Sequence, residues 1–203
     1  MTETININLE NLTKKERAQL FELLAKGKHL IFPKVENGET FKIGDIEFIK
    51  FTDIDGVTTA MTKEAVFKSD FGDNNNLADS KILDRLESEF LPKIIAAVGE
   101  ENILDFDTDL TTLDGVKTYG KITSKASLPT LDFYREHIEI FDKFKLDDWY
   151  WLATPWSALP HYDSSLVLCV APSGNFYDYG CNGHSGVRPI LHFKSSIFDP
   201  CED

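Results

Sequence analysis

The sequence predicts an α+β fold in which short helices surround small antiparallel sheets. Three observations favour this class. Segments with the 3.6-residue apolar period of a helix are few and short, segments with the apolar alternation of a strand are several, and the two kinds do not alternate as they do in a doubly wound parallel sheet. The chain has 203 residues, of which 42% are hydrophobic, so it is long enough to form one domain with a small appendage.

The first 35 residues predict a helical appendage to a domain that spans residues 36–203. Thr13 and Glu16 form a capping box, in which each side chain satisfies a free N–H group of the first helical turn. An apolar face continues to Ala25, and Gly27 can end the helix in a left-handed conformation. We expect this helix to dock on the main domain.

Residues 41–62 predict a β-hairpin, because apolar side chains alternate on both sides of Asp55-Gly56, a pair typical of tight turns. A helix is expected from about Ser80 to Leu91, with Pro92 at its end. The predicted buried face of this helix comprises Ile82, Leu83, Leu86 and Phe90.

The loop before this helix contains Asp73 and asparagines at positions 74–76. Oxygen ligands cluster in calcium-binding loops, but the spaced acidic ligands and bidentate glutamate of an EF-hand are missing. Asp and Asn side chains also hydrogen-bond to nearby backbone groups in turns and helix caps. We favour the turn interpretation, and expect no bound metal or cofactor.

Residues 100–128 predict loops and short strands, and a third helix is expected from Leu131 to Phe144 with Thr130 as its N-cap. The apolar face of this helix comprises Phe133, His137, Ile138 and Phe141. Among them His137 is expected to be a hydrogen-bonded packing residue rather than a ligand.

The last 55 residues are distinct in composition, because they contain 10 of the 24 aromatic residues and all three tryptophans. Strands are predicted at 149–152 and 166–170, the second an apolar run buried on both faces. After a turn at 172–175 a further strand is predicted at 176–179, and a closing strand at 186–193. The expected frame comprises Trp149, Trp151, Val167, Val170, Val187 and Pro189, and Arg188 is expected to hold the last strand through backbone carbonyls or a carboxylate.

Charge and cysteine content narrow the class of protein. The chain carries 34 acidic and 21 basic side chains, a net charge of -13, which disfavours a nucleic-acid-binding surface. No apolar run approaches the length of a membrane span, and no signal peptide is visible, so we expect cytoplasmic synthesis without membrane insertion. Cys169, Cys181 and Cys201 are odd in number and lack metal-binding spacing, so a disulfide scaffold is not expected.

Two segments, residues 156–165 and 177–185, combine Tyr and Trp with Ser, Gly, Asn and His. This is the composition of antibody-like binding surfaces, in which rigid rings supply contact area and small polar residues supply adaptable hydrogen bonds. The sequence therefore predicts a non-catalytic surface for a protein or glycan receptor, with hot spots at Trp156, Tyr177 and Tyr179. The candidate ligand-binding residues are Trp156, Ser157, His161, Tyr162, Asp163, Ser164, Tyr177, Asp178, Tyr179, Cys181, Asn182 and His184.

A family resemblance is carried by Trp149-Tyr-Trp-Leu, by Ser173-Gly-Asn and by Gly186-Val-Arg-Pro-Ile-Leu. This succession resembles the tail of C-type-lectin-fold proteins of the formylglycine-generating-enzyme type, in a branch common in Firmicutes and their phages. That branch also carries an Asp-Asn-Asn loop before a Ser-started helix, which matches Asp73 and Ser80 here. The resemblance covers about residues 40–198 and implies the C-type lectin fold.

The same fold and tail are similar to those of variable proteins of diversity-generating retroelements, which include phage receptor-binding tips. Such diversification randomises template adenines. Residues 161–165 and 177–185 are of the types that it produces. The resemblance therefore implies a variable binding region at 149–192 and association with a virion.

Two alternative functions accompany this prediction. Formylglycine-generating enzymes use a pair of copper-binding cysteines, and Cys169 and Cys181 could approach each other across two strands, with Cys181 the more exposed, in a copper- and thiol-dependent oxidase. A net charge of -13 would also suit an acidic, phage-encoded inhibitor that mimics nucleic acid.

Overall fold

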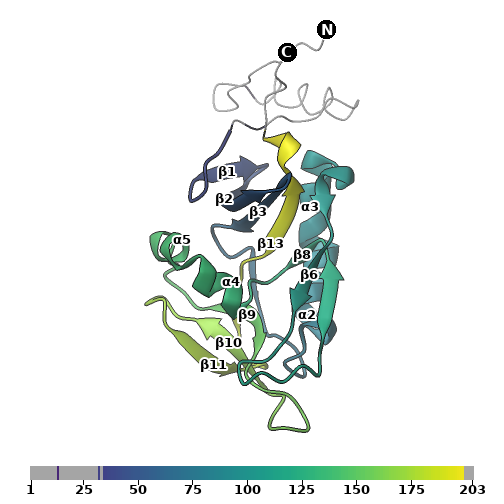
Figure 1. Ribbon diagram of the computed structural model, residues 1–203, viewed down its shortest axis with the longest axis vertical. Coiled ribbons are helices and arrows are strands. Elements are labelled where there is room, and N and C mark those ends of the chain that lie inside the picture. Colours follow the sequence, from purple (N-terminus) through teal and green to yellow (C-terminus); the bar gives the residue numbers. More distant parts are fainter. Residues whose placement is uncertain (1–12, 14–31, 33, 199–203) are drawn as a thin grey trace.

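The computed structural model describes residues 13, 32 and 34–198, and within them the fold is mixed α+β, with small sheets and few helices. Figure 1 shows the two larger sheets one above the other, with α4 and α5 on one flank and α2 and α3 on the other. The predicted class is confirmed. The predicted N-terminal helix lies outside the described residues.

The larger sheet contains the predicted hairpin. Its strands, in spatial order, are β1 (Thr40–Ile43), β2 (Ile46–Ile54), β3 (Val57–Thr62), β13 (Ile190–Lys194) and β5 (Ile103–Leu104), and β8 (Ala126–Ser127) also pairs with β13. The hairpin is confirmed as β2 and β3. Asp55 (φ 53°) and Gly56 (φ 77°) join the two strands, and two consecutive positive φ angles are what a type I′ hairpin turn requires.

The second sheet is formed mainly by the C-terminal quarter of the chain. Its strands, in spatial order, are β11 (Phe176–Gly180), β10 (Leu166–Val170), β9 (Tyr150–Pro155), β12 (Ser185–Val187) and β4 (Phe67–Ser69). Neighbouring strands are antiparallel except β9 and β12, which are parallel. A separate antiparallel hairpin consists of β6 (Phe106–Asp109) and β7 (Lys121–Ser124), so short strands within residues 100–128 are confirmed.

Strand β10 is buried on both faces, as predicted. Val167 and Cys169 belong to a core cluster that includes Trp151, whereas Leu168 and Val170 belong to a second cluster that includes Tyr150. We call these the Trp151 core and the Tyr150 core. Alternate residues of a strand point to opposite faces, so this sheet separates the two cores.

The predicted single closing strand at 186–193 is wrong. It consists of two strands, β12 in the second sheet and β13 in the first, separated by Arg188 and Pro189. The Arg188 side chain is fully buried at this crossing, where its Nε donates to the Thr62 carbonyl at 3.1 Å and its guanidinium lies 4.9 Å from the centre of the Tyr150 ring. The expected role of Arg188 in holding the last strand through backbone carbonyls is confirmed.

The helix predicted from Ser80 to Leu91 is longer than expected. Ser80 caps α2 (Lys81–Arg85) by accepting from the Leu83 N–H at 3.1 Å, and the helix continues through a π-helical turn (Leu86–Phe90) into α3 (Leu91–Val98). Pro92 therefore lies in the first turn of α3 and does not end the helix. A π turn opens the backbone ladder where the proline ring would otherwise clash with the preceding turn.

The third predicted helix is interrupted at His137. Thr130 caps α4 (Leu131–Glu136) as expected, and α5 (Ile138–Lys143) follows. The His137 Nδ1 lies 2.9 Å from the Phe133 carbonyl oxygen, and its ring packs on Phe133 and Phe51, which confirms a packing role. Ile138 is 42% exposed, because the break rotates α5 away from the face predicted for one continuous helix.

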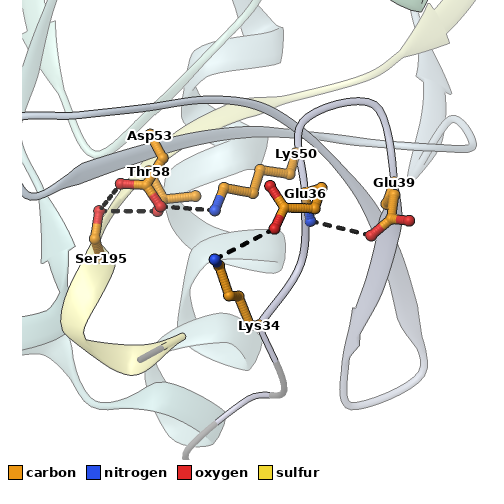
Figure 2. A network of polar contacts seen from close by, with 7 residues as sticks. All are labelled: Lys34, Glu36, Glu39, Lys50, Asp53, Thr58 and Ser195. Carbon is orange, nitrogen blue, oxygen red and sulfur yellow. Dashed lines mark hydrogen bonds and ion pairs between the residues drawn. The ribbon is translucent and has the colours of Figure 1, made fainter. Parts of the chain in front are cut away.

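A polar network ties the turn that follows β13 to β2 (Figure 2). Ser195, in the 3-10 turn Ser195–Ile197, donates to Asp53 at 2.6 Å, and Lys50 donates to the other oxygen of Asp53, also at 2.6 Å. The side chain of Lys50 is only 5% exposed, whereas that of Asp53 is 34% exposed. Burial raises the pKa of Asp53, but the hydrogen bonds from Lys50 and Ser195 outweigh it, so the pKa is lowered overall.

Candidate functional site

Segment 156–165 is held in place by Asn75, whose side chain is completely buried. The Asn75 amide donates at 2.8 Å to the carbonyl oxygens of both Ser157 and Leu166, and its oxygen accepts from the Tyr119 hydroxyl at 2.7 Å. The Asn75 backbone N–H also donates to the Ser164 carbonyl at 2.8 Å. One asparagine therefore fixes both ends of the segment and joins it to the loop that carries Tyr119.

The other two asparagines of the 73–76 loop, Asn74 and Asn76, take part in a turn and a helix cap. Asn74 accepts from the Asn76 N–H at 2.8 Å, and Asn76 caps the 3-10 turn Leu77–Asp79 by accepting from the Ala78 N–H at 3.2 Å. These bonds confirm the turn interpretation. Among the described residues no group of three or more His, Cys, Asp or Glu side chains is placed to hold a metal ion.

Ser157 is 1% exposed, which corrects its assignment as a ligand-contacting residue. Its hydroxyl donates to Asp114 at 2.6 Å, and the His161 Nε2 lies 3.6 Å from the same carboxylate oxygen. This is not a catalytic triad, because the carboxylate lies between the serine and the histidine and the serine hydroxyl is buried. The hydrogen bonds from Ser157 and Thr112 lower the pKa of Asp114, so the cluster fastens segment 156–165 to the 111–119 loop.

Three aromatic side chains form an exposed row on the second sheet. Trp149 is 38% exposed, Tyr177 48% and Tyr179 45%. The ring of Trp149 lies 5.2 Å from that of Tyr177, and the ring of Tyr179 lies 5.7 Å from that of the fully buried Trp151. We call Trp149, Tyr177 and Tyr179 the aromatic face. The expectation that Trp149 is a core residue is wrong, because it precedes β9 at the edge of the Trp151 core.

Gly183 supports this face from the following loop. A Cβ atom at Gly183 would lie 2.2 Å from a ring carbon of Tyr179, far inside van der Waals contact. The Tyr179 ring therefore lies directly over the glycine backbone on one side and near Trp151 on the other. This arrangement fixes the ring orientation while leaving nearly half of the residue open to solvent.

The two candidate segments meet at Cys181, where the Cys181 N–H donates to the Ser165 carbonyl at 2.8 Å. Around this junction Asn182, His184, His161 and Tyr162 are exposed, and Asp163 and Ser164 are partly exposed. The structure thus brings these six predicted residues to neighbouring loops. His184 interacts electrostatically with Asp70, whose pKa is lowered mainly by its hydrogen bond from Lys81.

Cys181 is only 5% exposed, so the expectation that it is the exposed cysteine is wrong. Burial raises the pKa of its thiol, and burial raises that of Cys169 to about 12. Cys169 lies opposite Tyr177 in the β10–β11 ladder. Cys181 follows Tyr177 by four residues, just beyond the end of β11. In an extended strand this spacing is about 13 Å, which places the two cysteines too far apart for a disulfide or a shared metal ion.

Trp156 and Asp178 do not join the aromatic face. Trp156 is partly buried and packs against the Tyr150 core, on the opposite side of the sheet from Trp151. Asp178 alternates with Tyr177 and Tyr179 along β11, so it also points to that opposite side. The hot spots predicted at Trp156, Tyr177 and Tyr179 are therefore split between the two faces of one sheet.

Two residues of this region were missed from the sequence. Trp149 belongs to the exposed row, and Asn75 positions segment 156–165 from a distance of 82 residues in the chain. The sequence did indicate that Trp149 is exposed, because Trp149 follows the acidic pair Asp147-Asp148, and such a pair is typical of a solvent-exposed connection. Nothing in the sequence indicated the role of Asn75, because its partners are two distant backbone carbonyls and the hydroxyl of Tyr119.

Comparison with known proteins gives no assignment: no family model, no curated protein and no solved structure matches the chain. In the part of the chain that the structure describes, no helix combines the length and apolar character needed to cross a membrane.

Proposed function

We propose that this chain is a non-catalytic ligand-binding protein that contacts a protein or glycan through the aromatic face. The observation that carries the proposal is the row of Trp149, Tyr177 and Tyr179, each between 38% and 48% exposed, on a sheet whose other residues are largely buried. Large amphipathic rings with few torsions are the residues that most often dominate binding energies.

Preorganisation supports the proposal. Trp151 and Gly183 confine Tyr179, and Asn75 confines segment 156–165. Rings that are already held in one orientation lose little conformational entropy on binding, and such losses are a main cost of association. The proposed contact surface therefore consists of the aromatic face with Asn182 and His184, flanked by His161, Tyr162, Asp163 and Ser164.

As the frame of this surface we propose the C-type lectin fold of the formylglycine-generating-enzyme type. Trp151 lies in β9, the 172–175 turn joins β10 to β11, and the segment 186–191 links the end of β12 to the start of β13. We extend the same proposal to a diversified receptor-binding protein, one that is encoded by a phage or linked to a retroelement and carried on a virion. A reverse-transcriptase gene and an adenine-rich near-copy of the 3′ end beside the gene are the test of that extension.

The alternative functions lack a comparable observation. An oxidase needs an accessible thiolate, whereas the thiols of Cys169 and Cys181 are buried and have raised pKa values. A mimic of nucleic acid needs carboxylates free to contact a basic partner, whereas several acidic side chains are paired within the chain. These pairs are Lys63–Glu47, Lys81–Asp70, Arg85–Glu89 and Lys68–Asp148.

The experiment is a binding screen with matched variants. The labelled full chain is applied to arrays of glycans and of purified surface proteins, beside Tyr177→Ala/Tyr179→Ala and the control Ile54→Ala, which removes a 62% exposed side chain at the hairpin tip. We expect wild type and control to bind the same array elements and the double variant to lose them. Equal binding by the folded double variant would contradict the proposal.

A further inference from the structure

The outer edge of β11 is a part of the candidate surface that the proposed function leaves unused. Among the described strands β11 pairs only with β10, and Figure 1 shows it at the margin of the second sheet. The strand at the opposite margin, β4, is partly covered, because Arg85 donates to the Lys68 carbonyl at 3.1 Å and its guanidinium lies 3.9 Å from the centre of the Phe67 ring. Within the described residues no side chain donates to the outer edge of β11 in this way.

The pairing of β11 with β10 determines which backbone groups point outwards. Just beyond β11, the Cys181 N–H donates to the Ser165 carbonyl at 2.8 Å, so these two residues form a hydrogen-bonded pair of the ladder. Such pairs alternate with non-hydrogen-bonded pairs along antiparallel strands. The backbone groups of Tyr177 and Tyr179 therefore also face β10, and those of the alternate residues face away from it.

The outward groups have the spacing of a strand that lacks a neighbour. Phe176 and Asp178 each direct an N–H and a C=O away from the sheet, and the two residues are about 7 Å apart along the edge. None of these four groups makes a hydrogen bond within the part of the chain that the structure describes. Donors and acceptors at this interval match the backbone of a further extended strand.

The side chains of β11 indicate the chemistry of that strand. Tyr177 and Tyr179 lie on one face and are 48% and 45% exposed. Asp178 is exposed on the other face, and its carboxylate has no salt bridge or hydrogen bond to the described residues. In cross-strand pairs, aromatic side chains combine favourably with aromatic or β-branched ones and opposite charges attract. The complementary strand therefore carries a basic residue between two such apolar residues.

A second copy of this chain does not meet these requirements. Antiparallel pairing of two β11 strands at full overlap would place the two Asp178 carboxylates directly opposite each other, and like charges in that position are destabilising. A charge on an edge strand is a common device against self-association. The net charge of -13 adds repulsion between copies and attraction for a basic partner.

We propose that β11 receives an extended basic segment of a partner protein as an additional antiparallel strand. The partner backbone exchanges hydrogen bonds with Phe176 and Asp178, a lysine or arginine lies opposite Asp178, and the flanking apolar side chains pack on Tyr177 and Tyr179. This inference rests on the proposed function and narrows its partner from a protein or glycan to a polypeptide.

The test begins with an array of immobilised heptapeptides that is probed with the labelled full chain. Each peptide has Lys, Glu or Ser at its centre, flanked on both sides by Val, Ile or Tyr, with Thr and Ser at the ends. We expect lysine-centred peptides to be bound in preference to glutamate- and serine-centred ones. No bound peptide, or no preference for lysine, overturns the proposal.

Backbone methylation distinguishes strand addition from binding by side chains alone. The tightest lysine-centred peptide is made with an N-methyl group on the central lysine, whose N–H faces β11, or on the preceding residue, whose N–H points away. Titration by fluorescence anisotropy is expected to show at least about ten-fold weaker binding for the first peptide and less than about three-fold weaker binding for the second. Equal effects of the two methyl groups overturn the antiparallel strand.

A charge reversal locates the strand at this edge. Asp178→Lys is expected to exchange the preference, so that glutamate-centred peptides bind about three-fold more tightly than lysine-centred ones. Asp45→Lys makes the same charge change at an exposed position between β1 and β2, and this matched control is expected to keep the preference of wild type. If Asp178→Lys fails to fold, Asp178→Asn decides, and is expected to lose the preference. A folded Asp178 variant that still prefers lysine overturns the assignment to β11.

Two other occupants are outcomes of the same measurements. A wild-type dimer that is seen by sedimentation equilibrium and dissociated by the lysine-centred peptide assigns the edge to a second copy and overturns the proposal. Binding of glycans that depends on Tyr177 and Tyr179, without binding of any peptide, also overturns strand addition but leaves the proposed function intact.

Discussion

Replacing Asn75, a completely buried residue, with alanine removes three side-chain hydrogen bonds at once. Two of them, at 2.8 Å, satisfy the carbonyls of Ser157 and Leu166, and the third, at 2.7 Å, satisfies the Tyr119 hydroxyl. A buried hydrogen bond contributes about 1 kcal/mol to the free energy of unfolding, so the loss amounts to about 3 kcal/mol. For a chain of this length that lowers the thermal midpoint by about 6–12 °C.

The assay is urea unfolding followed by far-UV circular dichroism, with Asn76→Ala as the matched control. The side-chain bonds of Asn76 are exposed and cap a single 3-10 turn, so the control is expected to lose less than about 1 kcal/mol. If Asn75→Ala cost no more than Asn76→Ala, Asn75 would not be the residue that fixes segment 156–165.

Asn75→Asp sharpens the same test. The carboxylate keeps an acceptor for Tyr119 but places an oxygen against two carbonyl oxygens that previously accepted N–H groups. Burial with Tyr119 as the remaining side-chain donor, and with two carbonyl oxygens facing the carboxylate, raises the pKa of the new carboxyl in the folded state above its unfolded value of about 3.9. The variant is therefore least destabilised below that pH, and its stability falls as the pH rises towards the folded-state pKa. Asn75→Ala should show no such pH dependence.

Three further predictions concern other parts of the fold. Asp53→Asn leaves the buried ammonium of Lys50 uncompensated. It should lower the free energy of unfolding by about 2 kcal/mol at pH 7, a figure discounted because the Asp53 side chain is 34% exposed. Because the pKa of Asp53 is lowered in the folded protein, urea unfolding should show the difference between variant and wild type shrinking as the pH falls below about 4. In a Cys201→Ser background, the buried Cys169 and Cys181 should react with a thiol reagent at pH 8 far more slowly in the native than in the urea-unfolded protein, and fast native labelling would contradict their burial. Gly183→Ala should displace the Tyr179 ring, because the added Cβ would lie 2.2 Å from it, and reduce ligand binding as strongly as Tyr179→Ala; unchanged binding would show that the ring orientation does not matter.

Features encoded within a few residues could be predicted from the sequence. Asp55-Gly56 determines a tight turn, Ser80 and Thr130 cap helices, and the apolar run of β10 is long enough only for a strand buried on both sides. In each case the local structure is determined by the same few residues that adopt it, and tertiary contacts do not change the result.

Features that depend on distant partners could not be predicted. Ser157 looks like a loop residue, but Asp114 and Asn75, 43 and 82 residues away, bury it. Trp156 lies in a segment with the composition of a binding surface, yet its position directly after β9 places it on the Tyr150 core. The two segments named from the sequence do meet at Cys181, while the face on which each ring lies depends on strand register.

The central claim is that the aromatic face is exposed for binding and is not part of the core, and the free energy of unfolding of Tyr177→Ala/Tyr179→Ala tests it most directly. Each residue is about half exposed, so removing both rings should cost no more than about 2 kcal/mol. Trp151→Ala, measured beside it, removes a fully buried ring and its hydrogen bond to the Ser69 carbonyl and should cost about 4–5 kcal/mol. A loss in the double variant as large as that in Trp151→Ala would show that the two tyrosines are core residues and would contradict the account.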